Sequence, residues 1–211
     1  MGTWAYASFF EWGFHRFVMH RAVGPLRHIF KGHAQVHHGI YQGDNTYVAG
    51  DRDPEEVTFG WWLMPIVPIL HIPPAIGLYL LFGLPSAAGL LTGVLLYQIV
   101  YEYVHFCMHV PQGRWVERRW AFRWVNDHHL QHHRKHLTNL NVFFPVADFI
   151  LGTRRLCAAP AAGAITEEMG YLPEYRRQPR REFFRKAGSE TRWLVGAISR
   201  RLVRVAAGIL P

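Results

Sequence analysis

The sequence predicts an all-α integral membrane protein, in which a transmembrane helical hairpin carries a cytoplasmic, histidine-rich helical cap. Three observations lead to this fold class. The 45 residues from Val57 to Tyr101 contain no Asp, Glu, Lys or Arg. The 14 histidines are gathered into short clusters, nearly all of them outside this apolar block. Basic residues flank the block on both sides, in a chain of 211 residues that is long enough for one domain.

The apolar block is long enough for two membrane spans joined by a turn. One span needs about 20 residues to cross about 30 Å of hydrocarbon, so we expect spans at about residues 59–82 and 86–106. Gly83 and Pro85 mark the turn, since glycine often follows a helix end and proline often begins a helix. Prolines interrupt the first span, which we expect to run without a break only from about Pro74. The alternative is a buried hairpin of a soluble protein, which would need charges on an outer face.

The charge distribution predicts how the chain lies in the membrane. The formal net charge is +8, and the basic residues precede or follow the apolar block, whereas its turn carries none. By the positive-inside rule, both termini and nearly all histidines are expected on the cytoplasmic side. The excess of Arg over Lys, together with the many Ala and Gly residues, is typical of a GC-rich bacterial gene, so we expect the protein in a bacterial inner membrane. Anionic lipid headgroups are the expected partner of these basic residues, rather than nucleic acid.

Four histidine clusters are the most informative feature of the sequence. His33 and His37 are four residues apart, as are the first and last histidines of the two later clusters, so the rings of each pair share a helix face. His15 and His20 are five apart, about 500° around an α-helix, and share a site only if the helix ends or bulges there. The ten histidines predicted as metal ligands are His15, His20, His33, His37, His38, His105, His109, His129, His132 and His133.

Ten imidazoles predict two adjacent metal ions. Neutral imidazole is the commonest nitrogen donor to transition metals, and ten donors are about twice what one ion needs. A zinc hydrolase is an alternative, but it needs about three ligands and an open position. A membrane metal-binding or transport protein is another alternative, although transporters usually place their ligands inside the spans, where only His71 lies.

The clusters and their surroundings resemble those of the fatty acid hydroxylase and sterol desaturase superfamily, whose members are membrane-bound di-metal oxygenases. Residues 11–20 resemble the opening motif of the fatty acid 2-hydroxylase branch, and residues 101–105 and 128–133 resemble its later motifs. Asn141 to Thr153 resembles the closing Asn…Asp…Gly-Thr signature. The resemblance covers about residues 10–155. It departs from the branch in the second cluster, where three residues rather than two separate the first pair of histidines.

The resemblance implies an oxidoreductase that holds two iron ions and uses O2 to hydroxylate a lipid, in the first instance a fatty acyl chain. Unactivated C–H bonds resist acid–base attack, so work on lipid chains needs such an oxidant. Zinc could replace iron in a purified form. The electrons would come from an external donor, either a ferredoxin or a b-type cytochrome with its reductase. Hydroxylation or desaturation of a sterol or carotenoid is the alternative within the superfamily.

Several polar residues near the clusters are candidates for an extra ligand or for orienting the imidazoles from behind. For the acids among them, an ordinary helix cap or surface ion pair is the alternative. The candidates are His128, His136, Glu11, Glu102, Asp127 and Asp148.

The chain is expected to divide into two parts. Residues 1–157 form the hydroxylase domain, and residues 158–211 form a basic tail. Within the tail, residues 192–210 alternate apolar and basic side chains, which is typical of a helix lying on an anionic membrane surface. A flexible basic tail is the alternative.

Overall fold

The computed structural model describes residues 2–44, 46–49, 57 and 63–156, and every regular element within them is helical, as the sequence predicts. The predicted tail over residues 158–211 and the first part of the predicted 59–82 span lie outside the described residues. In chain order the elements are α1 (Gly2–Phe14), η1 (His15–Met19), η2 (Gly24–Leu26), α2 (Arg27–Phe30), η3 (Lys31–His37), α3 (His38–Ile40), α4 (Leu63–Leu70), α5 (Ile72–Phe82), α6 (Leu84–His109), η5 (Val116–Arg118), α7 (Trp120–Arg134) and α8 (Val146–Ile150).

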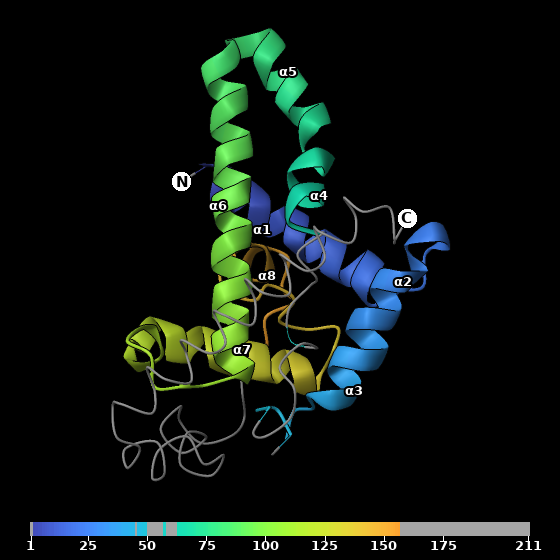
Figure 1. Cartoon of the computed structure of the whole chain (residues 1–211), viewed down its shortest axis with the longest axis vertical. Coiled ribbons are helices and arrows are strands. Elements are labelled where there is room, and N and C mark those ends of the chain that lie inside the picture. Colours follow the sequence, from blue (N-terminus) through green and yellow to red (C-terminus); the bar gives the residue numbers. More distant parts are fainter. Residues whose placement is uncertain (1, 45, 50–56, 58–62, 157–211) are drawn as a thin grey trace, which may run out of the picture. The chain divides into compact units, whose positions relative to one another are not determined.

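The long helix α6 packs against α1, α4 and α5 (Figure 1). Among the described helices, its 26 residues alone are long and apolar enough to cross a membrane. The pair α4 and α5 passes the same test together, with a bend of 48° at the break between them. The two predicted spans therefore correspond to the α4–α5 pair and to α6. Their insertion in a bilayer stays a prediction.

The turn of the hairpin lies where the sequence predicts it. Gly83 has a φ of 83°, which favours glycine, and its amide donates to the Tyr79 carbonyl at 2.8 Å. Pro85 lies in the first turn of α6. The break in the first span falls at His71, and α5 begins at Ile72 rather than at about Pro74. The helix starts earlier than expected because prolines are tolerated in the first turn of a helix, where an N–H has no partner.

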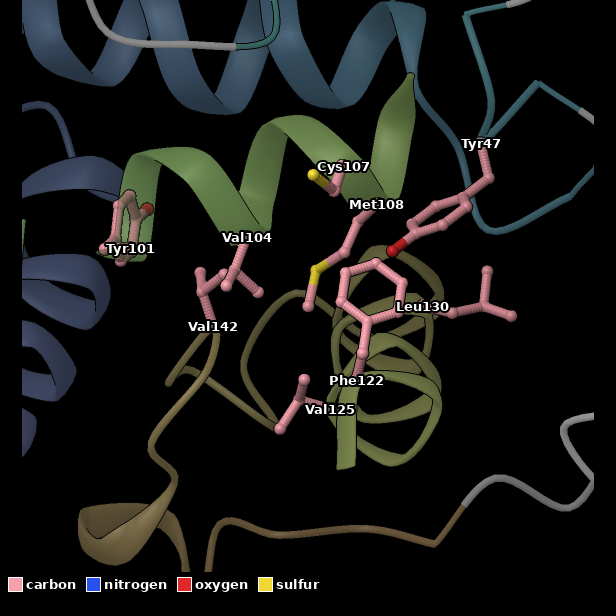
Figure 2. Close-up of a cluster of buried hydrophobic side chains, with 9 residues drawn as sticks. All are labelled: Tyr47, Tyr101, Val104, Cys107, Met108, Phe122, Val125, Leu130 and Val142. Atoms are coloured by element: carbon pink, nitrogen blue, oxygen red, sulfur yellow. The ribbon is translucent and has the colours of Figure 1, made fainter. Parts of the chain in front are cut away.

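The core below the hairpin joins α6 to α7. Figure 2 shows Met108 of α6 directed toward Phe122 of α7, with Val142 of the following segment beside Val104. Leu130 and Cys107 are both fully buried in this cluster, so the Cys107 thiol belongs to the core. This packing fixes the end of α6 that carries two histidines against the helix that carries three more of the predicted ligands.

Helix α1 is attached to both α6 and α8. The Ser8 hydroxyl donates to the Phe144 carbonyl at 2.7 Å and accepts from the Ala147 amide at 3.0 Å. The Trp4 ring packs edge-on against Tyr97 of α6 at 5.9 Å between centroids. These contacts hold the start of α1, and so determine where η1 brings the first histidine cluster.

Substitution of Gly43 by Ala tests a close approach between the segment after α3 and the end of α7. A Cβ at this position would lie 2.8 Å from the backbone nitrogen of Arg134, so one of the two segments must move. We expect a loss of about 1–3 kcal/mol in the free energy of unfolding, measured from thermal midpoints of the detergent-solubilised protein.

The matched control is Gly39→Ala, since a Cβ there meets nothing within 4 Å. It should leave the midpoint unchanged or raise it slightly, because alanine favours helix. Equal midpoints for the two variants would contradict the close approach at Gly43.

Candidate metal centre

Ten histidine side chains converge into two groups of five, and within each group one ring nitrogen per residue lies within 4.8 Å of all the others. They are the ten histidines that the sequence predicts as ligands. Nine are buried and His20 is half-buried. The first group consists of His15, His20, His33, His38 and His132, and the second of His37, His105, His109, His129 and His133.

The first cluster reaches one site through a π-helical turn. Residues His15–Met19 form the π-helix η1, which closes with a 3.1 Å bond from the His20 amide to the His15 carbonyl. Residues five apart lie above one another in this geometry. The His15 and His20 rings accordingly stack with centroids 5.0 Å apart. This is the bulge that the five-residue spacing required.

A second π-helix divides the next cluster between the two groups. η3 covers Lys31–His37, so His33 and His38, five residues apart, place their Nε2 atoms 3.1 Å from each other in the first group. His37 lies in the second group instead, with its ring centroid 4.9 Å from that of His105. The extra residue in this cluster is thus accommodated by the wider turn.

Helix α7 contributes to both groups. His129 and His133 belong to the second group, and their Nε2 atoms are 3.0 Å apart. His132 belongs to the first, with its Nε2 atom 3.1 Å from that of His38. The pattern His-x2-His-His therefore places α7 between the two sites. His105 and His109 of α6 complete the second group.

Backbone carbonyls fix the orientation of four of these rings. The Nδ1 atom of His15 bonds the Leu140 carbonyl. The other three contacts join His109 to the carbonyl of Tyr47 (2.7 Å), His132 to that of Thr138 (2.9 Å), and His133 to that of Tyr41 (2.6 Å). Because a carbonyl only accepts, each Nδ1 carries the proton, and the Nε2 lone pair faces the centre of its group.

Such a donor set fits a cation at the centre of each group. In the second group, the Nε2 atoms of His109 and His133 lie 3.2 and 3.0 Å from that of His129, which can donate to only one of them. His105 is fully buried, and neither of its ring nitrogens has a hydrogen-bond partner in the part of the chain that the structure describes. Nitrogens bound at right angles to one metal ion, each about 2.1 Å from it, would lie about 3 Å apart. The observed separations match that value.

The electrostatics of the groups favours neutral imidazoles. Burial, reinforced by the neighbouring histidines, lowers the pKa of His20 to about 2. Burial lowers the pKa of His15 to about 4, although its bond to Leu140 acts in the opposite direction. The pKa values of His33, His129, His132 and His133 fall well below 6.5, mainly through burial. Neutral imidazole is the form that binds metals, so these rings need lose no proton to do so.

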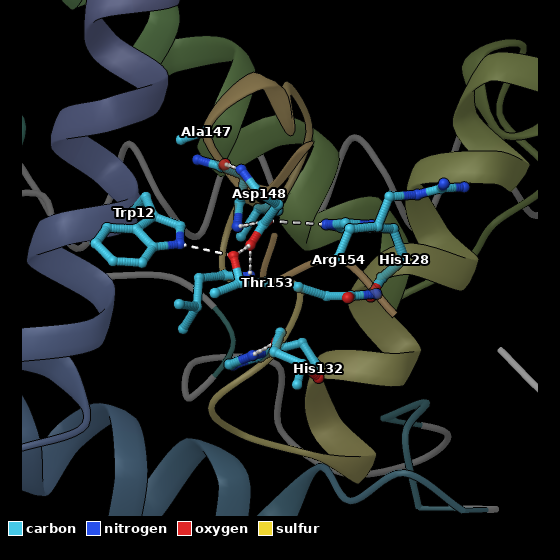
Figure 3. Close-up of polar contacts among 12 residues, drawn as sticks. Trp12, His128, His132, Ala147, Asp148, Thr153 and Arg154 are labelled. Carbon is cyan, nitrogen blue, oxygen red and sulfur yellow. Dashed lines mark hydrogen bonds and ion pairs between the residues drawn. The ribbon is translucent and has the colours of Figure 1, made fainter. Parts of the chain in front are cut away.

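Asp148 holds the segment that supplies two of the orienting carbonyls. Its carboxylate accepts from the backbone amides of Leu140 at 3.0 Å and Asn141 at 2.7 Å. It also accepts from the Thr153 hydroxyl at 2.6 Å and lies 3.1 Å from the Nε2 atom of His128 (Figure 3). Burial alone would raise the pKa of Asp148, but these bonds outweigh it and lower the pKa. The Asn…Asp…Gly-Thr signature therefore positions His15 indirectly.

Glu11 holds the same segment from the other side. Its carboxylate accepts from the Val142 amide at 2.6 Å, the Asn141 side chain at 3.0 Å and the Tyr97 hydroxyl at 2.5 Å. It thereby links α1, α6 and the segment that follows α7. Burial raises the pKa of Glu11 to about 7, despite the opposing effect of these three donors.

The other predicted supporting residues differ in position. His128 contacts Asp148 and lies outside both groups. His136 is exposed at the rim, with its ring centroid 4.3 Å from that of His38. Glu102 accepts from Gln98 at 2.8 Å. Asp127 is half-buried, and within the described residues it makes no hydrogen bond to any of the ten histidines.

The carbonyl groups that orient the rings cannot be recognised in the sequence, because every residue has a backbone carbonyl and the side chains of these four residues give no signal. Tyr41 and Tyr47 lie in the segment after α3, and both are fully buried. Thr138 and Leu140 lie between α7 and the closing signature. The Asn…Asp…Gly-Thr signature is the one sequence feature that points to them, since it contains Asp148, which holds the segment with Thr138 and Leu140 in place.

Replacing Asp148 by Asn tests its indirect control of the first group. In the variant, an amide nitrogen replaces one carboxylate oxygen and faces groups that are themselves donors, such as the backbone amides of Leu140 and Asn141. Because the bonds that hold this segment weaken, the carbonyl of Leu140 should lose its position behind His15. We expect metal binding to weaken about 10–100-fold, as for other residues that support ligands. Metal content by mass spectrometry and competition with a chelator would measure this effect.

The control for this experiment is Asp127→Asn, the same chemical change at a carboxyl on the neighbouring helix α7. Its metal affinity should equal that of the wild type. If both variants lose metal equally, the bonds around Asp148 do not position the site.

Replacing Glu11 by Gln tests the raised pKa of this carboxyl. Since the pKa is about 7 in the folded protein and 4.5 in the unfolded chain, the folded form binds more protons between these values. The stability due to Glu11 is therefore complete below pH 4.5 and is lost as the pH rises through 7. Because Gln does not titrate, the wild type should lose stability relative to the variant as the pH rises across this window, and the difference between their thermal midpoints should change accordingly. A constant difference would contradict the shift.

Comparison with known proteins agrees with this geometry. No curated protein and no solved structure gives a significant match to the chain. A family model described as fatty acid hydroxylase matches residues 1–153, a range that contains both histidine groups and the closing signature. Members of this family are membrane-bound, metal-dependent oxidoreductases. Because the match covers more than half of its length, the chain belongs to the fatty acid hydroxylase family.

Proposed function

We propose that this protein is a membrane-bound non-haem di-iron oxygenase that hydroxylates a lipid, with a fatty acyl chain as the first-choice substrate and the fatty acid 2-hydroxylase branch as its nearest relatives. The observation that carries the proposal is the pair of five-histidine groups in a chain of the fatty acid hydroxylase family. Two adjacent sites built from neutral nitrogen donors suit a pair of redox-active ions.

Bound iron would supply the redox chemistry that reduction of O2 requires, and zinc would not. In the overall reaction, one oxygen atom enters a C–H bond to give an alcohol and the other leaves as water. Two electrons and two protons from an external donor, a ferredoxin or a b-type cytochrome with its reductase, complete the balance.

The protein's own residues would hold the ions, orient the imidazole rings and exclude water from them. The Nε2 atoms would hold the ions, and the carbonyls of Tyr41, Tyr47, Thr138 and Leu140 keep the proton of the four rings that they contact on Nδ1. The cluster of Met108, Phe122, Leu130 and Val142 packs between α6 and α7 and keeps solvent from the groups. A water-poor site strengthens the electrostatic interactions within it.

The proposed membrane position rests on α6 and its flanks. Exposed apolar side chains cover the hairpin, among them Leu80 and Leu81 of α5 and Leu96 of α6. Arg114, Arg118 and Arg119 follow α6 at the end that carries His105 and His109. By the positive-inside rule, that end and the histidine groups face the cytoplasm, where soluble electron donors can reach them.

Isotope labelling with ¹⁸O2 tests the proposed function. The iron-loaded protein, supplied with a reductase and donor, should incorporate one labelled oxygen atom into an added fatty acyl lipid. His132→Ala should lower the rate at least about 100-fold, since even residues behind metal ligands cost 10–100-fold. Mass spectrometry of the products would also identify sterol or carotenoid hydroxylation or desaturation.

The control is His28→Ala, which changes an exposed histidine outside both groups and should keep wild-type activity. Full activity with zinc alone would overturn the iron proposal. Equal losses in the two variants would overturn the role of the histidine groups.

A further inference from the structure

A small cavity lies where α1, α4 and α6 meet. Its volume is about 50 Å³, and most of its lining is apolar, with Phe10 and Phe14 of α1, Val67 and Leu70 of α4 and Val94 of α6. A water molecule needs about 10–15 Å³ in the same measure. The cavity therefore has room for a polar group and a few carbon atoms, and a long chain bound there would extend beyond it.

His71 borders this cavity at the bend between α4 and α5. The side chain is fully buried, and its ring lies 4.3 Å from that of Phe10 between centroids. Its Nδ1 atom lies 2.7 Å from the Val67 carbonyl. Because the carbonyl only accepts, Nδ1 carries the proton and Nε2 presents a lone pair.

Among the described residues, the Nε2 atom of His71 has no hydrogen-bond partner. Other polar groups that border the cavity are engaged. The Glu11 carboxylate accepts three bonds from α6 and the segment after α7. The Gln98 amide donates to Glu102 at 2.8 Å. A buried acceptor without a partner is unfavourable, so its lone pair is available to a donor that enters the cavity.

A second proton on Nε2 would not remove the need for a partner. It would create a buried charge beside the Phe10 and Tyr6 rings, which carry no counter-charge, and the Glu11 carboxyl that borders the cavity is already engaged by three donors. His71 therefore accepts a hydrogen bond in this position and does not donate one through Nε2.

The cavity also borders residues next to both histidine groups. Met19 lines it and belongs to the same π-helix as His15 of the first group. Tyr101 lines it as well, and its ring centroid is 5.7 Å from that of His105 in the second group. A molecule held in the cavity would thus end close to the candidate metal centre.

We propose that this cavity binds the polar end of the lipid substrate, and that His71 Nε2 accepts a hydrogen bond from an O–H or N–H group there. The substrate class is then a lipid alcohol or amide, rather than an ester or a carboxylate, neither of which has a donor to offer. This proposal rests on the proposed function, because it assigns the substrate of the same site.

The test compares two probes with the same alkyl chain, of which one has an O–H donor and the other has a methyl group in place of that hydrogen. Dodecan-1-ol and its methyl ether are titrated into the metal-loaded full-length protein in detergent, and the shift of the thermal midpoint with concentration gives each affinity. The wild type should bind the alcohol up to about tenfold more tightly than the ether, as expected for one neutral hydrogen bond.

Variants at position 71 assign the difference to this residue. His71→Phe keeps a ring of similar size but removes the acceptor, and should bind the two probes equally. His71→Gln keeps an acceptor near the place of Nε2 and should preserve part of the preference. His71→Leu replaces the Phe variant if that chain fails to fold, as judged by its metal content.

Two results would overturn the proposal. One is equal affinity of the wild type for both probes, which would mean that water satisfies His71 or that nothing does. The other is a preference for the alcohol that persists in His71→Phe. The binding assay needs no turnover, so a failure of ¹⁸O incorporation alone would overturn the proposed function and leave standing only the binding of donor-bearing molecules beside His71.

Discussion

The candidate metal centre depends on where each histidine carries its proton. A ring that donates from Nδ1 to a fixed carbonyl has one remaining lone pair, and the backbone decides where it points. Four rings are fixed in this way, by carbonyls from the segment after α3 and from the segment after α7. Asp148 and Glu11 hold the latter segment, so a single hydrogen-bonded network connects α1, α6 and α7 to the ring orientations.

The two π-helical turns bring together histidines that are five residues apart, which a regular α-helix does not do. Two rings five residues apart point in different directions on an α-helix, whereas the wider turn aligns them. η1 aligns His15 with His20, and η3 aligns His33 with His38 while directing His37 to the other group. Single π-turns are rare in proteins, but those that occur are often found at functional sites. A π-turn interrupts the regular hydrogen bonding of the α-helix, so another interaction must offset this loss. Shared ions at the centre of each group would provide that interaction.

Much of this arrangement could be predicted from the sequence, because it follows from residue spacing and charge. Features that depend on the tertiary structure could not be predicted in this way. Helical spacing and the absence of charge predict the hairpin, its Gly83–Pro85 turn and the gathering of ten histidines. The division between two groups could not be predicted, since it depends on π-turns and on the direction of α7. Likewise, Asp127 and Asp148 look alike in the sequence. Only the tertiary structure shows that Asp148 accepts from two backbone amides, whereas within the described residues Asp127 makes no hydrogen bond to any of the ten histidines.

The continuity of α6 links the membrane-facing part of the molecule to the chemistry. The same helix contains residues that line the cavity and two histidines of the second group. A lipid bound in the cavity would therefore lie at a fixed depth relative to these histidines. Tyr101 and His105 are four residues apart, about 6 Å along the axis, and Gln98 is about 10 Å from His105. With its polar end beside His71, a lipid whose chain ran along α6 would pass Tyr101, which borders both the cavity and His105. If both proposals hold, we expect oxidation on the part of the chain nearer the polar group rather than at its far end.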